Sequence, residues 1–579
     1  MVNSGCVLLE ARKQRIQFTE VRLMKILSLL TLTLIMVLAV ASAQNWTMEN
    51  YDNSMSRHSP QMLVNKSNVD QLQIRWILNT GATLEAPPLI VGDTGFIQNN
   101  AMRVIAFDMN TGLSKWVYDP NIPSVNNELP RATLSHGITY EDGIIYAPTG
   151  PNGTILAIDA LKGTKIWESP VVQSNSTAFR ISAMPLVWKN YVIAGSALGD
   201  EPPFGFPQKG TVTALDKKTG KIVWQTKLAV GDWVEGQNAS LNGGATAWTG
   251  GAVDMDKGIV YLPVGNPAPD FTAESRPWPN LYANNVVAVN LNDGKILWAT
   301  PFVAKGSVFN LTADVDTHDW DTTWGTNLVT IDTKNGTEKA VVGHDKRGDI
   351  IVMNATTGKP IWWKVVAVTA NNDAVPTPNG SIVTWPGADH GIEAWTAFDN
   401  STLYAAVSNN GYSFFSGPGY GGHIAPVFNA SATGIGNGSI VALDLATGKV
   451  KWEHKTMFPT WVSPLVTNGI VFSGHVTATG KPYPYDDFGG PTKTPLIPSG
   501  IILALDADTG KTLWAFNLGA PCGVGGPSIG NGMLLVPTGV GQVPNKGGYL
   551  IAFGLPSGTR TGLTMDQLDS LPLSNQTIS

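Results

Sequence analysis

Five short segments carry side chains that could do chemistry, because they place acids, an imidazole, cations and an amide outside any repeated pattern. Neighbouring carboxylates raise one another's pKa, which suits general acid catalysis. Carboxylate and amide oxygens bind hard cations, and Lys or Arg suits an anionic ligand. Turn formation would explain one such loop, whereas five of them favour a site. The segments are GDEPPFG (199–205), GGATAW (243–248), VGNPAPD (264–270), DVDTHDWDTTWG (314–325) and GHDKRGD (343–349).

These segments lie between copies of one repeat, in which an apolar run precedes Asp or Asn, with Gly four residues later and Trp four residues after that. The apolar run predicts a strand. Asp or Asn accepts backbone hydrogen bonds in the turn, Gly supplies a positive φ, and Trp can wedge between neighbouring sheets. The seven copies span 104–116, 155–167, 212–224, 286–298, 350–362, 440–452 and 502–514.

An eighth copy is divided between the two ends of the chain. QLQIRW (71–76) has the Trp strand without its partner, and GYLIAFGLP (548–556) has the partner without its Trp. Paired, the two would close a ring and hide both sheet edges. The sequence therefore predicts an all-β fold, an eight-bladed β-propeller over residues 44–556, followed by a tail at 557–579.

Composition agrees with this architecture and excludes several classes of protein. Hydrophobic residues are 43% of the 579 residues and charged residues only 14%, against about 25% charged in an average domain. So few ionisable groups would suit life in acid, although a surface rich in Ser, Thr and Asn explains them equally well. A net charge of −6 argues against nucleic-acid binding. The two cysteines cannot build a zinc site or a disulfide framework.

The first 43 residues read as a leader and signal peptide. Lys25 is followed by an apolar run (26–40) and by Ala-Ser-Ala at 41–43, and Met24 is a possible true start. An uncleaved anchor is the alternative, although the run is short for a membrane span. Thirteen Asn-x-Ser/Thr sequons suggest a secreted or cell-surface glycoprotein without a membrane span after cleavage. A bias toward Asn and Thr in turns explains some of them.

From about Asn45 to Pro556 the chain resembles the pyrroloquinoline-quinone (PQQ) alcohol dehydrogenases, which are eight-bladed propellers with tryptophan-docking repeats. The resemblance implies calcium ligands at Glu201, Asn266 and Asp321, with Asp321 as the catalytic base. Other residues that match the family's cofactor contacts are Lys346, Trp248, Glu85 and Trp461.

Several departures from that family stand beside the match. The mature chain has one cysteine instead of an adjacent pair stacked on the quinone, and His136 in SHGITY replaces the usual Arg. The loop of Glu201 carries an insertion, and no haem domain is fused. Thr323 stands where lanthanide-dependent members carry an Asp, which argues against a lanthanide.

The chain also resembles the tetrathionate hydrolases of acidophilic sulfur oxidisers, which fit these departures better. This resemblance implies an exported, acid-active homodimer that hydrolyses tetrathionate to thiosulfate, sulfate and sulfur without a cofactor. In this first interpretation Asp321 protonates the leaving sulfur or orients water, with Asp319 and Glu201 as further candidates. The cations expected to hold the small inorganic dianion are Lys346, Arg347, His136 and Arg131.

Two alternatives stay open. The first is a PQQ- and calcium-dependent dehydrogenase of alcohols or sugars, and the second is a non-enzymatic surface propeller. The scaffold is disfavoured because it needs no acid, amide and lysine at matching positions. Cys522 could be a nucleophile, but a buried small residue explains APCGVGG more simply.

Overall fold

The computed structural model describes most of the chain between Asn45 and Pro556. The predicted leader (1–43) and tail (557–579) lie outside the described residues, so both boundaries stay predictions. The described ranges are 45–122, 134–172, 181–197, 209–229, 243–268, 282–302, 320–322, 324–334, 336–371, 381–386, 390–409, 412–416, 424–427, 438–456, 459–478, 498–539 and 548–556.

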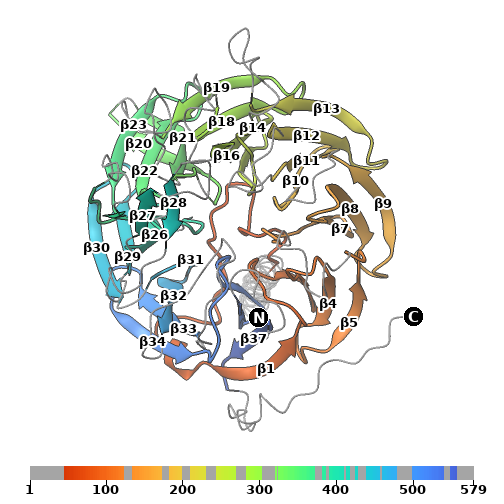
Figure 1. Cartoon of the computed structure of the whole chain (residues 1–579). Helices are drawn as coiled ribbons and strands as arrows, with labels where there is room; N and C mark the ends of the chain where they lie inside the picture. Colours follow the sequence, from red (N-terminus) through yellow and green to blue (C-terminus); the bar gives the residue numbers. More distant parts are fainter. Residues whose placement is uncertain are drawn as a thin grey trace, which may run out of the picture.

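The described residues form a ring of eight four-stranded antiparallel sheets around a central axis (Figure 1). This confirms the predicted eight-bladed propeller. In chain order, the first three sheets are β2–β5 (Leu89–Val91, Thr94–Gln98, Val104–Asp108, Ser114–Tyr118), β6–β9 (Thr139–Glu141, Ile144–Pro148, Thr154–Asp159, Lys165–Pro170) and β10–β13 (Leu186–Trp188, Tyr191–Gly195, Thr211–Asp216, Ile222–Lys227). The next two are β15, β16, β18 and β19 (Ala252–Asp254, Ile259–Val264, Asn285–Asn290, Ile296–Pro301) and β20–β23 (Asn327–Thr333, Gly336–His344, Asp349–Asn354, Pro360–Val365). The sixth and seventh are β25, β26, β29 and β30 (Ala397–Phe398, Thr402–Ser408, Gly438–Asp444, Val450–Thr456) and β31–β34 (Val462–Thr467, Ile470–Ala478, Pro498–Asp506, Thr512–Asn517).

The eighth sheet closes the ring as the sequence predicted. Strand β1 (Gln73–Asn79), from the N-terminal side, pairs with β37 (Tyr549–Gly554), beside β36 (Met533–Pro537) and β35 (Ser528–Gly530). Trp76 lies opposite Ala552 in this pairing. Small additions are the 3-10 helix η1 (Val69–Gln71), the pair β14 (Gly243–Gly244) and β17 (Pro267–Ala268), and the sheet of β24 (Ser381–Thr384), β27 (Tyr412–Ser416) and β28 (Ile424–Val427).

Seven of the repeat tryptophans join their blades to the next one. Trp224 Nε1, for example, donates a hydrogen bond to the Leu291 carbonyl at 3.1 Å, and a Cβ added at Gly294 would lie 2.6 Å from the Trp224 ring. Gly therefore lets the ring lie flat on the neighbouring turn, at a φ of +73°. Equivalent bonds run from Trp76, Trp116, Trp167, Trp298, Trp362 and Trp452.

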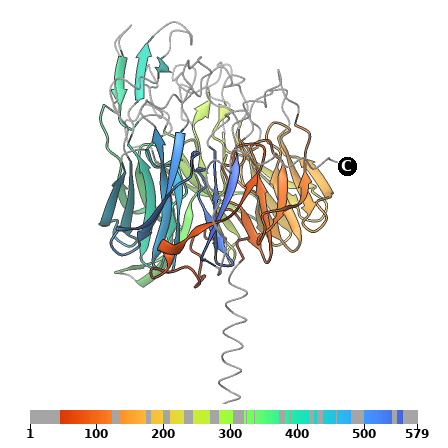
Figure 2. The same cartoon turned by 90° about the horizontal axis from the view of Figure 1, so that it is seen from below.

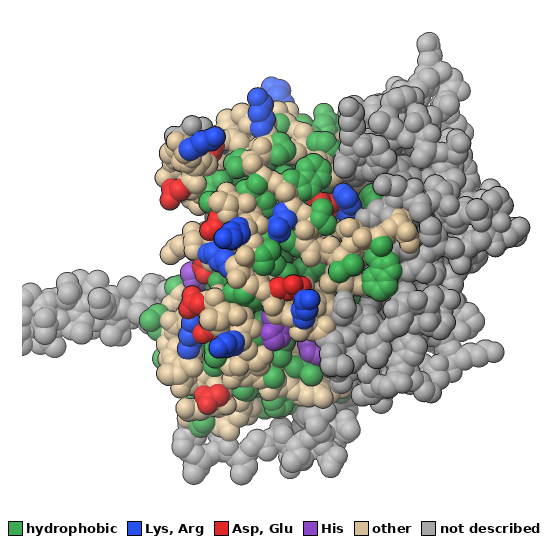
Figure 3. All heavy atoms as spheres, turned by 90° about the vertical axis from the view of Figure 1, so that its left-hand side faces the viewer, with side chains coloured by type: hydrophobic (Ala, Val, Ile, Leu, Met, Phe, Trp, Pro, Cys, Tyr) green, Lys and Arg blue, Asp and Glu red, His purple; other side chains and the backbone are tan. Residues whose placement is uncertain are grey.

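The first strand of each blade faces the axis and the fourth faces outward, as Figure 1 shows. All three residues of β10 are buried, whereas every residue of β13 is exposed or half-buried. On the side drawn in Figure 3, acidic and basic side chains of the described residues are interspersed with apolar ones. Within the described ranges no helix is long and apolar enough to span a bilayer.

Candidate functional site

The acid, the amide and the lysine implied by the quinoprotein resemblance meet near the axis. Asp321 Oδ1 accepts a hydrogen bond from the Asn266 backbone N–H at 2.6 Å, and its Oδ2 lies 3.1 Å from Lys346 Nζ. The Lys346 backbone N–H also donates to the Asp321 carbonyl at 3.1 Å. All three residues are buried, and Asp321 is 6% exposed. The structure thus holds one carboxylate by both oxygens within a buried ion pair.

Asn266, Lys346 and Asp321 are brought together by the antiparallel arrangement of strands within the blades. Asn266 follows the end of β16 and Lys346 follows the end of β21, whereas Asp321 precedes β20. In a blade, the end of the second strand and the entry to the first strand lie at the same end of the sheet. Segments far apart in the sequence therefore converge at one end of the axis.

Gly265 explains why Asp321 and Trp248 can share a wall of the site. A Cβ at position 265 would lie 2.5 Å from Asp321 Oδ1 and 2.9 Å from Trp248 Nε1. Any larger residue would push one of these side chains away. Trp248 is half-buried, so its ring lines the site without being covered completely.

His136 and Trp324 pack against Trp248 to form an aromatic floor, the name used below for these three side chains. The His136 ring centroid lies 5.1 Å from that of Trp248 and 4.7 Å from that of Trp324, both edge to face. Complete burial lowers the pKa of His136 to about 3. His136 is therefore neutral near pH 7 and offers no positive charge to an anion, contrary to expectation.

Arg347 lies beside the site but is engaged elsewhere. Its Nη1 is 3.2 Å from Asp349 Oδ2, and its guanidinium lies over the Trp320 ring. Burial raises the pKa of the neighbouring Asp345, and repulsion from Asp349 adds to this. These contacts assign Arg347 to a local acidic cluster rather than to the carboxylate of Asp321.

The last two cofactor-contact candidates are both buried near the axis. Trp461, just before β31, stacks on His390 with ring centroids 5.6 Å apart and 5° between the planes. Glu85, before β2, accepts a hydrogen bond at its carbonyl from the Gly525 N–H. Their side chains are 8% and 5% exposed. Glu201, Asp319, Thr323 and Arg131 lie outside the described residues.

Sequence reasoning missed Glu393, whose Oε1 lies 3.8 Å from Lys346 Nζ, and it missed Trp324 in the floor. The only available signal was their place outside the repeat.

Cys522 is buried, and burial raises the pKa of its thiol to about 12, which makes it a poor nucleophile. Among the described residues no group of three His, Cys, Asp or Glu could hold a metal.

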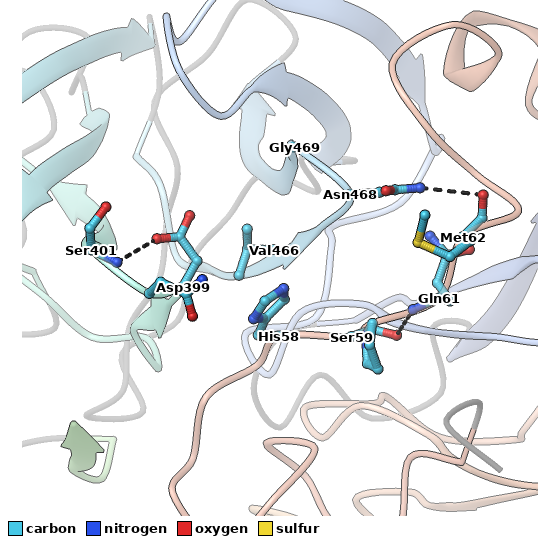
Figure 4. A pocket seen from close by; sticks show the side chains of 11 residues that line it. His58, Ser59, Gln61, Met62, Asp399, Ser401, Val466, Asn468 and Gly469 are labelled. Carbon is cyan, nitrogen blue, oxygen red and sulfur yellow. Dashed lines mark hydrogen bonds between the residues drawn. The ribbon is translucent and has the colours of Figure 1, made fainter. Parts of the chain in front are cut away.

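A hollow of about 490 Å³ lies elsewhere, where the N-terminal segment meets the blades of β26 and β32 (Figure 4). Two of its polar side chains are engaged in local bonds. Asp399 Oδ1 accepts the Ser401 N–H at 3.0 Å, and Asn468 Nδ2 donates to the Met62 carbonyl at 3.3 Å. This hollow contains none of the predicted site residues, so the buried acid–lysine pair is the better candidate for chemistry.

Fold and site together define an eight-bladed propeller that carries a buried acid–lysine pair and an aromatic floor near its axis. The sequence profile of the PQQ-type glucose/ethanol/alcohol dehydrogenase β-propeller domain matches residues 46–386. The chain belongs to this family.

Named relatives agree with this assignment. The chain is 26% identical to quinoprotein alcohol dehydrogenase PedH of Pseudomonas putida, over 80% of each chain. It is 25% identical to the putative dehydrogenase XoxF of Paracoccus denitrificans, over 89% of this chain and 95% of that one. The fold matches quinohemoprotein alcohol dehydrogenase ADHIIG of Pseudomonas putida, with a TM-score of 0.73 at 18% identity over 92% and 85% of the two chains. A europium-containing methanol dehydrogenase matches with a TM-score of 0.71 at 22% identity over 89% and 98%.

These relatives correct the first interpretation of the sequence. The prediction of a tetrathionate hydrolase is wrong, because the relatives are quinoprotein dehydrogenases and the family profile is that of a PQQ propeller. The expectation that no cofactor is required falls with it. The acid habitat rested on the same interpretation and has no support from the comparisons.

Proposed function

We propose that the protein is a dehydrogenase of alcohols or sugars that uses PQQ together with a divalent cation such as calcium. The observation that carries the proposal is the buried Asp321, whose two oxygens are held separately by the Asn266 N–H and by Lys346. The quinoprotein names of the relatives support the same reading. A small organic hydroxyl compound replaces the inorganic anion as the expected substrate.

The residues present fit the proposed cofactor. The carboxylate of Asp321 and the amide of Asn266 are hard oxygen donors, which calcium prefers. Lys346 is a buried ammonium suited to an anionic oxygen, and the half-buried Trp248 ring suits a flat aromatic ligand. The neutral His136 supplies no charge, so Lys346 would carry most of the attraction for the cofactor's carboxylates.

The chain's own residues would divide the chemistry between them. When bound, PQQ supplies the two-electron acceptor for the alcohol carbon. Asp321 would take the proton of the substrate hydroxyl, with its carboxylate oriented by the Asn266 N–H. Lys346 pairs with the Asp321 carboxylate and, with three N–H donors, can also hold a ligand oxygen. The aromatic floor would keep water from one side of the site.

The test is reconstitution of the purified protein with PQQ and calcium, or with lanthanum in parallel, followed by dye reduction on a panel of alcohols and sugars. Activity should depend on PQQ, the cation and the substrate. Asp321→Asn should lower kcat by about 10²–10⁴-fold and leave the fold intact.

The matched control is Asp216→Asn, a repeat-turn position where other copies carry Asn290 or Asn354. Its activity should equal that of the wild type. Absence of quinone binding, or full activity in Asp321→Asn, would overturn the proposal. The hypothesis of a non-enzymatic scaffold would then be favoured, although it gives no reason for the buried Lys346.

Export from the cytoplasm, glycosylation and a homodimer stay predictions. The signal peptide lies outside the described residues. Peptide mapping of the secreted protein and its mass in solution would test all three.

A further inference from the structure

One N-terminal segment, residues 45–61, touches the first strand of blade after blade, and we call it the axial strap. It crosses the centre of the ring (Figure 1) and lies at the lower end in Figure 2. Backbone hydrogen bonds tie it to six blades, at Ile90, Tyr140, Val253, Leu328, Phe398 and Val466. Side-chain or sulfur contacts reach the other two, at Met184 and Ile529.

The axial strap delivers one base and one acid to the interior, Arg57 and Glu49, both 0% exposed. The Arg57 guanidinium binds backbone carbonyls, because it donates hydrogen bonds to Pro464 at 2.6 Å and Pro527 at 2.9 Å. It also donates to the Glu49 carbonyl at 3.2 Å. Burial lowers the pKa of Arg57 to about 9, so it is still charged at neutral pH. The Glu49 carboxyl group is thereby left for other partners.

Both carboxyl oxygens of Glu49 face segments that carry the aromatic floor. Oε1 accepts a hydrogen bond from Trp395 Nε1 at 2.9 Å, and the Trp395 ring packs against Gly325, the neighbour of Trp324. Oε2 lies 2.8 Å from the place of a Cβ on Gly137, the neighbour of His136. One acid thus contacts the chain neighbour of His136 directly and the chain neighbour of Trp324 through Trp395.

Three polar atoms in this place have no hydrogen-bond partner among the described residues: Glu49 Oε2, His136 Nδ1 and Trp324 Nε1. A buried polar atom without a partner is costly. Such groups persist where they serve a site or share a bound molecule. Two of these groups, His136 and Trp324, pack against Trp248, and Glu49 Oε2 lies beside Gly137, the neighbour of His136. The three atoms therefore belong to one part of the interior, where a site can use them.

We propose that Glu49 is a positioning residue, which holds the aromatic floor of the cofactor site from the opposite end of the ring. The inference rests on the proposed function, because it assigns the floor to a quinone. It differs from that function in placing a required group on the axial strap, outside the segments that carry the site.

The first test is PQQ affinity, measured by titration in the presence of calcium. Glu49→Ala should weaken binding by about tenfold or more, the range known for residues that orient others at a bound group. Glu49→Gln, which keeps an acceptor for Trp395, should bind close to the wild-type value. Glu141→Ala, on the outer ion pair with Lys217, is the control and should not change. Wild-type affinity in folded Glu49→Ala overturns the inference.

The second test needs no PQQ and separates failure of the inference from failure of the proposed function. In the protein without added cofactor, the melting-temperature losses of Glu49→Ala and His136→Ala should sum to more than the loss in the double variant. Strict additivity overturns the inference, even if the wild type binds no quinone. The pair Glu141→Ala and His136→Ala should be additive. If Glu49→Ala does not fold, Trp395→Phe, which removes the donor to Oε1, replaces it in both tests.

Discussion

The outer junctions between blades and the axis of the ring satisfy their polar groups in different ways. At each of seven junctions a tryptophan donates to a carbonyl in the next repeat, as Trp116 does to Ala160. At the axis, Arg57 donates to Pro464 and Pro527, which are 407 and 470 residues away in the chain. The junction is built from one motif and its neighbour, whereas the axis is built from the whole ring.

This difference shows that the junction contacts are redundant, whereas the axial contacts are not. Losing one junction leaves six others of the same kind among the described blades. The axial groups have no second copy, and they include the fully buried Arg57. Changes at the axis should therefore cost more than equivalent changes at a junction, and the following predictions test that order.

The largest effect is expected for Arg57→Met. It removes a buried guanidinium and leaves several carbonyls without donors, at a cost of about 3–5 kcal/mol in the free energy of unfolding. Arg103→Met is the control, since its pair with Asp119 is 42% exposed on the Arg side and should cost no more than about 1 kcal/mol. Guanidinium unfolding measures both. Equal costs would break the comparison.

The next effect is expected for Gly163→Ala at a junction. Its φ of +67° is strained for Ala, and a Cβ would lie 2.6 Å from the Trp116 ring. The two terms together should cost about 2–4 kcal/mol. Gly143→Ala, with a φ of +83° and nothing within 4 Å of its Cβ position, should show the backbone term alone, about 1–2 kcal/mol. A cost for Gly163→Ala no larger than for its control would show that the rings move aside freely.

The two regions should also respond to pH with opposite signs. Burial raises the pKa of Glu49 from 4.5 to about 8, so its contribution to stability is complete below pH 4.5 and is lost as pH rises through 8. Hydrogen bonds from Thr219 lower the pKa of the turn residue Asp216 below 3.8, so its contribution is lost as pH falls through the folded pKa.

Glu49→Gln should therefore flatten the decline in melting temperature between pH 4.5 and 8. One unit of effective shift corresponds to about 1.4 kcal/mol. Asp216→Asn should leave that decline unchanged and affect only the strongly acidic range. If Glu49→Gln shows the same decline in melting temperature as the wild type, the decline is caused by the titration of another group.

The smallest effect is expected for Trp224→Phe. Phe keeps the flat apolar ring but cannot donate to the Leu291 carbonyl, which should cost about 1 kcal/mol. Trp298→Phe at the next junction should add independently, as thermal unfolding of the double variant would show. A much larger cost would mean that one junction is not replaceable by the others.

Much of the fold could be predicted from the sequence, because each repeat satisfies its own turn and docks on the next. Asp216 Oδ1 accepts bonds from its own turn at Lys218 and Thr219, and these residues stand side by side in the chain. The site was harder to predict. Asp321, Asn266 and Lys346 could be named by resemblance, but nothing local showed that Glu393 approaches Lys346 or that His136 is neutral.

By itself, therefore, the sequence determined the eight blades, their tryptophan docking and the closure of the ring by its two ends. These features depend on spacings within one repeat or on two complementary half-repeats. Only the tertiary structure determined the arrangement at the axis. It brings together the hydrogen bond and the ion pair of Asp321, the aromatic floor and the buried Glu49 of the axial strap. Burial and the meeting of residues hundreds of positions apart arise only when the ring has closed around them.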